Sequence, residues 1–169
     1  MLQIELNTGP QWQNGIDWQK RSEEAAKAAL SVSSYGGLAD RNFALEISIK
    51  LSGNEEVQQL NLAYRGKDKP TNVLSFPMVP YDLLDGLSNS DDGEVLLGDI
   101  IMAYDICQNE AQEKAIPMED HASHLLVHGV LHLLGHDHEQ ESDALIMEAL
   151  EIKALQNLGI ANPYIEQHI

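Results

Sequence analysis

Residues 128–138 of the chain read HGVLHLLGHDH, and this stretch decides which kind of fold we expect. The sequence that leads into it, from Pro117 onward, is largely apolar and carries proline where a helix has its first turn. Gly135 is the residue type that commonly ends a helix, because glycine adopts left-handed backbone angles without strain. We therefore predict a long helix from Pro117 to Leu134, followed by a sharp reversal of the chain.

Two histidines of this predicted helix, His128 and His132, are four residues apart, so both imidazoles project from one face. That separation suits two nitrogens that each lie about 2.0–2.1 Å from one zinc ion. The reversal at Gly135 lets His138 return as a third ligand. Three protein ligands leave one coordination position open for water, as in catalytic zinc sites. We predict one Zn²⁺ per chain, held by these three histidines and used in catalysis.

The neighbouring histidines fit other roles better. A single histidine on an apolar helix face is more often a hydrogen-bonded core residue than a metal ligand. His124 extends the stripe of His128 and His132 by one turn, but a linear stripe cannot close around one ion. We expect His121 and His124 to pack in the core or to support the ligands, while His136 points off the ligand face.

Outside this helix, the chain alternates between strand-like and helix-like periods. Apolar residues alternate with polar ones, or form short buried runs, in four predicted strands at residues 2–6, 43–50, 73–76 and 96–102. Helical patterns occupy residues 18–32, 54–64, 105–115 and 141–158, and residues 80–93 form a polar loop. The predicted fold class is α+β, a small mixed sheet packed against helices, with a zincin-like metal-binding helix followed by a C-terminal helix.

Length and composition indicate one compact cytoplasmic domain. A chain of 169 residues with 43% hydrophobic content suits a single core, so we expect residues 1–169 to form one domain. The opening MLQIELNTGP lacks the features of a signal peptide, and no stretch approaches the roughly 18 apolar residues of a membrane span. Cys107 is the only cysteine, which excludes an intramolecular disulfide and a cysteine metal cluster. We expect no membrane partner.

The formal charge of −17 weighs against non-specific binding to nucleic acid, because an acidic surface repels a polyanion. We expect no DNA partner. Three of the ten basic residues, Arg65, Lys67 and Lys69, nevertheless fall within five positions and can form one local basic patch. The planar guanidinium of Arg65 can bind phosphate through two hydrogen bonds, whereas the lysines offer point charges. Lys67 and Lys69 are candidate contacts to a phosphate backbone, although a solubilising role explains them equally well.

The spacing HxxxHxxGxxH is also the zinc-binding pattern of the metzincin proteases. In those enzymes a glutamate follows the first histidine and acts as the general base for peptide hydrolysis. This chain has Gly129 there, so peptide cleavage would lack its usual proton acceptor. Phosphodiester hydrolysis tolerates the loss better, because a metal supplies the nucleophile and a nearby cation neutralises charge on the phosphate.

Three blocks of sequence together resemble one known family. They are residues 61–77, NLAYRGKDKPTNVLSFP, then residues 97–100, LGDI, and then residues 128–138. With these blocks the chain resembles the YbeY family of bacterial single-strand-specific endoribonucleases. The likeness covers most of the chain after the first predicted strand. The chain departs from the family pattern at Asn72, where many members carry an aspartate.

The resemblance implies a zinc ion held by His128, His132 and His138, and an arginine at position 65 that activity requires. It implies single-stranded RNA as substrate and a role in rRNA maturation, at the 3′ end of the small-subunit 16S rRNA, and in ribosome quality control. The implied partners are the small ribosomal subunit and its assembly factors.

Two other classes of function stay open on the sequence alone. A zinc metalloprotease would need another general base, for which His136 and Glu139 are candidates. A non-catalytic ribosome-assembly factor would hold a structural metal with a fourth protein ligand. We expect Ser75 to be a structural residue of its strand, and Asp99 to form a cap or an ion pair, or to orient a ligand imidazole.

Overall fold

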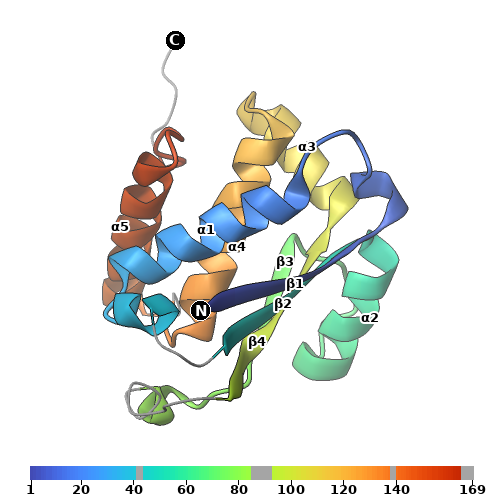
Figure 1. The fold of residues 1–169 in the computed structure, drawn as a ribbon. Coiled ribbons are helices and arrows are strands. Elements are labelled where there is room, and N and C mark those ends of the chain that lie inside the picture. The colour runs from blue at the N-terminus through green and yellow to red at the C-terminus, as the bar shows by residue number, and fades with distance from the viewer. Residues whose placement is uncertain (41–43, 85–92, 138–139, 165–169) are drawn as a thin grey trace.

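The computed structural model describes residues 1–40, 44–84, 93–137 and 140–164. A four-stranded mixed sheet lies at its centre (Figure 1). Its strands, in the order β1-β2-β4-β3, are β1 (Leu2–Thr8), β2 (Ala44–Ser52), β4 (Glu94–Ala103) and β3 (Val73–Pro77). β1, β2 and β4 run parallel to one another, and β3 pairs antiparallel with β4 along the edge.

Alternation along β2 explains the two faces of the sheet. Leu45, Ile47 and Ile49 are fully buried on one face, while Ser48 and Lys50 point to the other. Successive side chains of a strand lie on opposite sides, so one face packs on the core and the other carries polar groups. The strand predicted from residue 43 begins at Ala44, and Phe43 lies outside the described residues.

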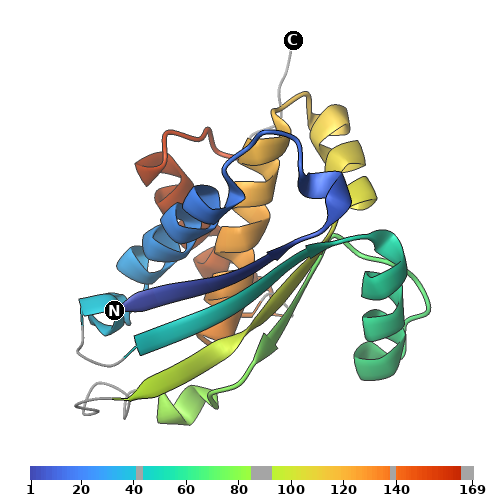
Figure 2. The same ribbon diagram turned by 45° about the vertical axis from the view of Figure 1, so that its right-hand side comes forward.

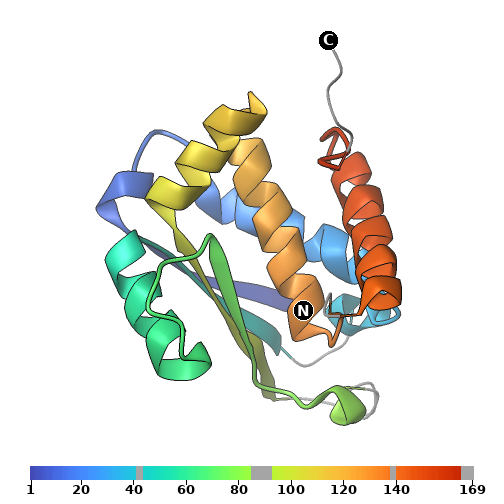
Figure 3. The ribbon, with the colours of Figure 1, turned by 180° about the vertical axis from the view of Figure 1, so that it is seen from behind.

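Helices cover the two faces of the sheet unequally. The described residues include α1 (Trp18–Val32), α2 (Asn54–Arg65), α3 (Tyr104–Lys114), α4 (Met118–Leu133) and α5 (Glu141–Asn157). Figure 2 shows α1 and α4 on one side of the sheet and α2 on the other. α4 contacts β3, β4, α1, α3 and α5, and Figure 3 shows it between α3 and α5. The predicted α+β fold class is thereby confirmed.

The predicted helix ends agree with the structure within about two residues, and the small differences have simple causes. Pro117 is the residue before α4 and not part of its first turn, because its ψ of 144° is extended. Arg65 belongs to the last turn of α2, one residue beyond the predicted end, and the helix ends at Gly66, whose φ of 68° is left-handed. Gly135 has a φ of 93°, as expected for the reversal after α4.

No helix in the described part of the chain combines the length and the apolar character needed to cross a membrane.

Candidate active site

The predicted site residues that the structure describes surround one open cavity of about 710 Å³. His128 and His132 of α4 lie on one side of it, and β3 with the C-terminal end of α2 lies on the other. Arg65, Lys67 and Lys69 line the same cavity. The turn after α2 therefore brings the predicted cations to the histidine face of α4, although more than fifty residues separate them in sequence.

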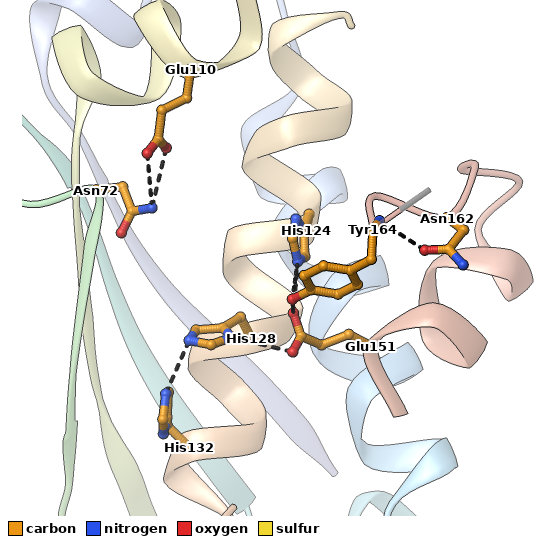
Figure 4. A network of polar contacts seen from close by, with 8 residues as sticks. All are labelled: Asn72, Glu110, His124, His128, His132, Glu151, Asn162 and Tyr164. Atoms are coloured by element: carbon orange, nitrogen blue, oxygen red, sulfur yellow. Dashed lines mark hydrogen bonds and ion pairs between the residues drawn. The ribbon is translucent and has the colours of Figure 1, made fainter. Parts of the chain in front are cut away.

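The two histidines face each other across one turn of α4. Their Nε2 atoms are 3.0 Å apart, and their rings are nearly perpendicular, with centroids 4.5 Å apart (Figure 4). Two nitrogens bound tetrahedrally to one zinc ion at about 2.0–2.1 Å would be about 3.3 Å apart. A small rotation of either ring gives that separation, so the pair fits a zinc ion.

Hydrogen bonds fix which ring nitrogen of each histidine carries the proton. Nδ1 of His132 lies 2.9 Å from the carbonyl oxygen of His136, and Nδ1 of His128 lies 3.3 Å from a carboxylate oxygen of Glu151. A carbonyl or carboxylate oxygen has no proton to give, so each Nδ1–H donates. In the neutral form of each ring, Nε2 then carries the lone pair, and the two Nε2 atoms point toward each other. Two such lone pairs at 3.0 Å repel each other unless a cation or a proton lies between them, which is the chemistry of a metal-binding pair.

Glu151 of α5 accepts a hydrogen bond from Nδ1 of His128, on the side of the ring away from His132, and was not among the predicted site residues. Its carboxylate, with a side chain only 1% exposed, also accepts hydrogen bonds from His124 Nε2 at 2.6 Å and from the hydroxyl of Tyr164 at 2.8 Å. Burial alone would raise the pKa of Glu151, but the hydrogen bonds from His124 and His128 outweigh it and lower the pKa to about 2. The carboxylate is therefore ionised and orients the imidazole of His128.

The sequence does contain a pattern that indicates a buried role for Glu151. Met147, Ala154 and Leu155 form the buried face of α5, and Glu151 lies on that face at helical spacing. A carboxylate on an apolar stripe needs a partner, because an unpaired buried charge is strongly unfavourable. The identity of the partner follows only from the packing of α5 on α4.

His138 and Glu139 lie outside the described residues, so the structure does not place the predicted third ligand. Among the described side chains, no three histidine, cysteine, aspartate or glutamate residues form a group able to hold a metal ion. Asp137, the residue before His138, lines the cavity beside His132. The three-histidine zinc site stays a prediction, with two of its ligands positioned as the spacing requires.

A model of the family described as Endoribonuclease YbeY matches residues 9–159 of the chain. The chain belongs to the YbeY family. It is 50% identical over 167 residues to the Endoribonuclease YbeY of Sphingopyxis alaskensis, in a match that covers 99% of both chains. It is 51% identical over 164 residues to that of Rhizorhabdus wittichii, with 97% of both chains covered. The resemblance found from the three sequence blocks is thereby confirmed.

The YbeY-family chain is also similar to the solution structure of a Thermotoga maritima protein. The TM-score is 0.54 at 22% identity, and the match covers 94% of this chain and 92% of that one. At this level of identity, the likeness concerns the fold alone.

Gly129 is the position at which the YbeY-family chain differs from the metzincin pattern, and the structure gives a packing reason for glycine there. A Cβ atom at residue 129 would lie 3.0 Å from Cδ1 of Ile100 and 3.1 Å from Oγ of Ser75. Even a methyl group at this position requires the side chains of Ile100 and Ser75 to move by a few tenths of an ångström, and a longer side chain requires a larger shift of these neighbours or of the helix. A glutamate at this position could not act as a general base without such a shift.

Asp99 lies away from the histidines, contrary to one of the roles considered for it. It is paired with Ser48 of β2 and with Phe76 of β3, and these side chains share the face of the sheet that α2 partly covers. α4, which carries His128 and His132, lies on the opposite side of the sheet (Figure 2). Asp99 therefore does not orient a ligand imidazole.

Asn72, the departure from the family pattern, belongs to a polar network at the edge of the cavity. Its side-chain amide donates to Glu110 at 3.1 Å (Figure 4). Its side-chain oxygen accepts from the backbone N–H of Val73 at 2.7 Å. The same Glu110 oxygen lies 2.9 Å from Nε2 of His121. An amide at position 72 suits this arrangement, because a carboxylate there would lie against the carboxylate of Glu110. His121 thus packs in the core and hydrogen-bonds to Glu110, not to His128 or His132, as expected.

Proposed function

We propose that the chain is a zinc-dependent endoribonuclease that cleaves single-stranded RNA, and that it matures the 3′ end of the small-subunit 16S rRNA in the cytoplasm. The observation that carries the proposal is the convergence of two imidazole Nε2 atoms in the same cavity as Arg65. The relatives named Endoribonuclease YbeY support RNA as the substrate. The small ribosomal subunit and its assembly factors are the proposed partners, and ribosome quality control is the proposed wider role.

Each residue of the proposed site has a distinct part in the proposed reaction. His128, His132 and His138 would hold the zinc ion, which when bound supplies Lewis-acid activation of water and of a phosphate oxygen. Glu151 keeps the Nδ1–H of His128 engaged, so that Nε2 points into the cavity. Arg65 binds the scissile phosphate and neutralises charge that develops on its oxygens. Lys67 and Lys69 contact neighbouring phosphates.

The charge distribution favours a single strand over a duplex. The chain carries −17 overall, while Arg65, Lys67 and Lys69 concentrate positive charge at one cavity. A flexible single strand can enter such a cavity with one stretch of backbone. A duplex would bring many additional phosphates against the acidic surface.

Two alanine variants separate metal binding from phosphate binding. His128→Ala should lose bound zinc and RNA cleavage together, whereas Arg65→Ala should keep its zinc and lose about 100-fold or more in turnover. Zinc content is measured by elemental analysis, and cleavage is measured on a labelled single-stranded RNA and on the same sequence as a duplex. Full activity in either variant would contradict the proposed roles.

The same preparations test the two rival functions. Cleavage of casein by the zinc-loaded protein, without cleavage of RNA, would indicate a metalloprotease. Undiminished binding of Arg65→Ala to the small subunit, with no cleavage by the wild type and a fourth protein ligand on the metal, would indicate a non-catalytic assembly factor.

A further inference from the structure

A second cavity, of about 320 Å³, lies on the face of the sheet that α2 partly covers. Tyr64 at the end of α2 and Phe76 of β3 line both this cavity and the histidine cavity. Their rings meet edge to face, with centroids 5.2 Å apart and planes at 61°. The two aromatic rings therefore form a ridge between the two cavities, and Arg65 follows Tyr64 directly in sequence.

The second cavity combines apolar walls with a polar floor. Leu60 of α2 and Met78 after β3 contribute apolar surface at its sides. Ser48 and Asp99 are paired across neighbouring strands and form part of the floor. This composition suits a flat, largely apolar ligand with hydrogen-bond donors at its edge.

The charges of this cavity favour a base over a phosphate. Glu56 of α2 lines it and is bound by Lys50 Nζ at 2.7 Å, so that lysine is already paired with a carboxylate. Asp99 adds a second carboxylate. Carboxylates repel phosphate, but they accept hydrogen bonds from the amino and imino groups of nucleobases.

We propose that this second cavity binds one unpaired nucleobase of the substrate strand, while a phosphate one or two nucleotides away lies at Arg65. The inference rests on the proposed nuclease function and extends it. Tyr64, whose side chain is among the most exposed apolar groups at 71% exposure, offers its ring for stacking with the base as the strand crosses the ridge. A base held in a duplex must first unpair and unstack to reach the cavity, which costs free energy, so the site also favours single strands.

A scan of abasic substitutions, combined with a variant that fills the cavity, tests the proposal. The probe is a short single-stranded RNA of defined cleavage site, in which one nucleotide at a time lacks its base. Wild-type protein should lose about tenfold in kcat/KM at one position close to the cleaved bond, because stacking of one base contributes about that factor. Ser48→Phe places a ring on the floor of the cavity. With intact RNA, the kcat/KM of this variant should be about tenfold lower than that of the wild type. Removal of the base at the sensitive position should not lower it further.

Leu62→Ala provides the matched control, because Leu62 is an exposed apolar residue of α2 that lines neither cavity. It should respond to the abasic scan as the wild type does. If Ser48→Phe does not fold, as judged by its circular dichroism, Leu60→Trp fills the cavity from the α2 side instead. The proposal would be overturned if a folded variant with the filled cavity still lost about tenfold in kcat/KM on the abasic RNA. It would also be overturned if no abasic position lowered the kcat/KM of the wild type.

The affinity of zinc-free protein for the same RNAs separates this inference from the proposed function. A wild type that cleaves no RNA would refute the proposed nuclease function. Binding of a base in the second cavity is tested separately, by measuring the Kd of each RNA by fluorescence anisotropy. A tenfold weaker Kd for one abasic RNA, cancelled by Ser48→Phe, supports the base site. Equal Kd values for all abasic RNAs refute it.

Discussion

Replacement of Glu151 by glutamine tests whether the hydrogen bond from Nδ1 of His128 to Glu151 contributes to metal affinity. One carboxylate oxygen accepts from His124 and Tyr164, and the other faces Nδ1 of His128 at 3.3 Å. Glutamine has the same shape but only one acceptor oxygen. That oxygen should stay with the two donors, because the alternative orientation sets the amide NH₂ against both of them. The NH₂ group then faces the N–H of His128, which loses its acceptor.

The expected loss follows from the geometry of this contact. An imidazole whose outer N–H has no acceptor is free to rotate and is a weaker base, and loss of such support lowers metal affinity by about 10- to 100-fold. The side chain is only 1% exposed, so water cannot replace the missing acceptor without a rearrangement. The free energy of unfolding of the zinc-free protein should fall by about 1–3 kcal/mol for the same reason.

Zinc affinity is measured by competition with a chromophoric chelator, and stability is measured by urea unfolding in the presence of excess chelator. Glu141→Gln provides the control, because it makes the same substitution at an exposed position of the same helix. It should leave zinc affinity unchanged. An unaltered zinc Kd in a folded Glu151→Gln protein would refute the reasoning that Glu151 positions His128.

Three further predictions concern stability. Asn72→Asp should lower the free energy of unfolding by about 1–2 kcal/mol at pH 7, because two carboxylates then meet, and adding Glu110→Gln should restore it. Gly129→Glu should cost about 3 kcal/mol or more in urea unfolding and should not confer casein cleavage, because a side chain there collides with Ile100. Burial lowers the pKa of His121, partly offset by its hydrogen bond to Glu110. Below about pH 6.5 the unfolded chain therefore takes up a proton that the folded chain does not, so stability should fall as the pH drops from 7 to 5. His121→Gln should flatten that part of the urea profile; a slope unchanged from the wild type would contradict this assignment.

Local patterns in the sequence predicted the elements well. The helix expected at residues 18–32 is α1 with the same bounds, and the four strands lie where apolar residues alternate or form short runs. Such patterns report which side of an element is buried, because the side-chain period follows from backbone geometry alone. They carry no information on which strands pair. The order β1-β2-β4-β3 and the antiparallel edge strand β3 depend on contacts between distant segments.

In the candidate site, too, some contacts follow from the sequence pattern and others depend on tertiary packing. The four-residue spacing of His128 and His132 within a helix is enough to bring their imidazoles together, and the structure has their Nε2 atoms 3.0 Å apart. Glu151 lies 23 residues further along the chain and reaches His128 only because α5 packs on α4. Spacing along one helix is fixed by its regular hydrogen bonds, whereas a contact between two helices depends on how the whole core packs. The sequence by itself thus determined that His128 and His132 meet, and which elements surround them. Only the tertiary structure decided which carboxylate contacts His128, and that the basic turn after α2 faces the two histidines across one cavity.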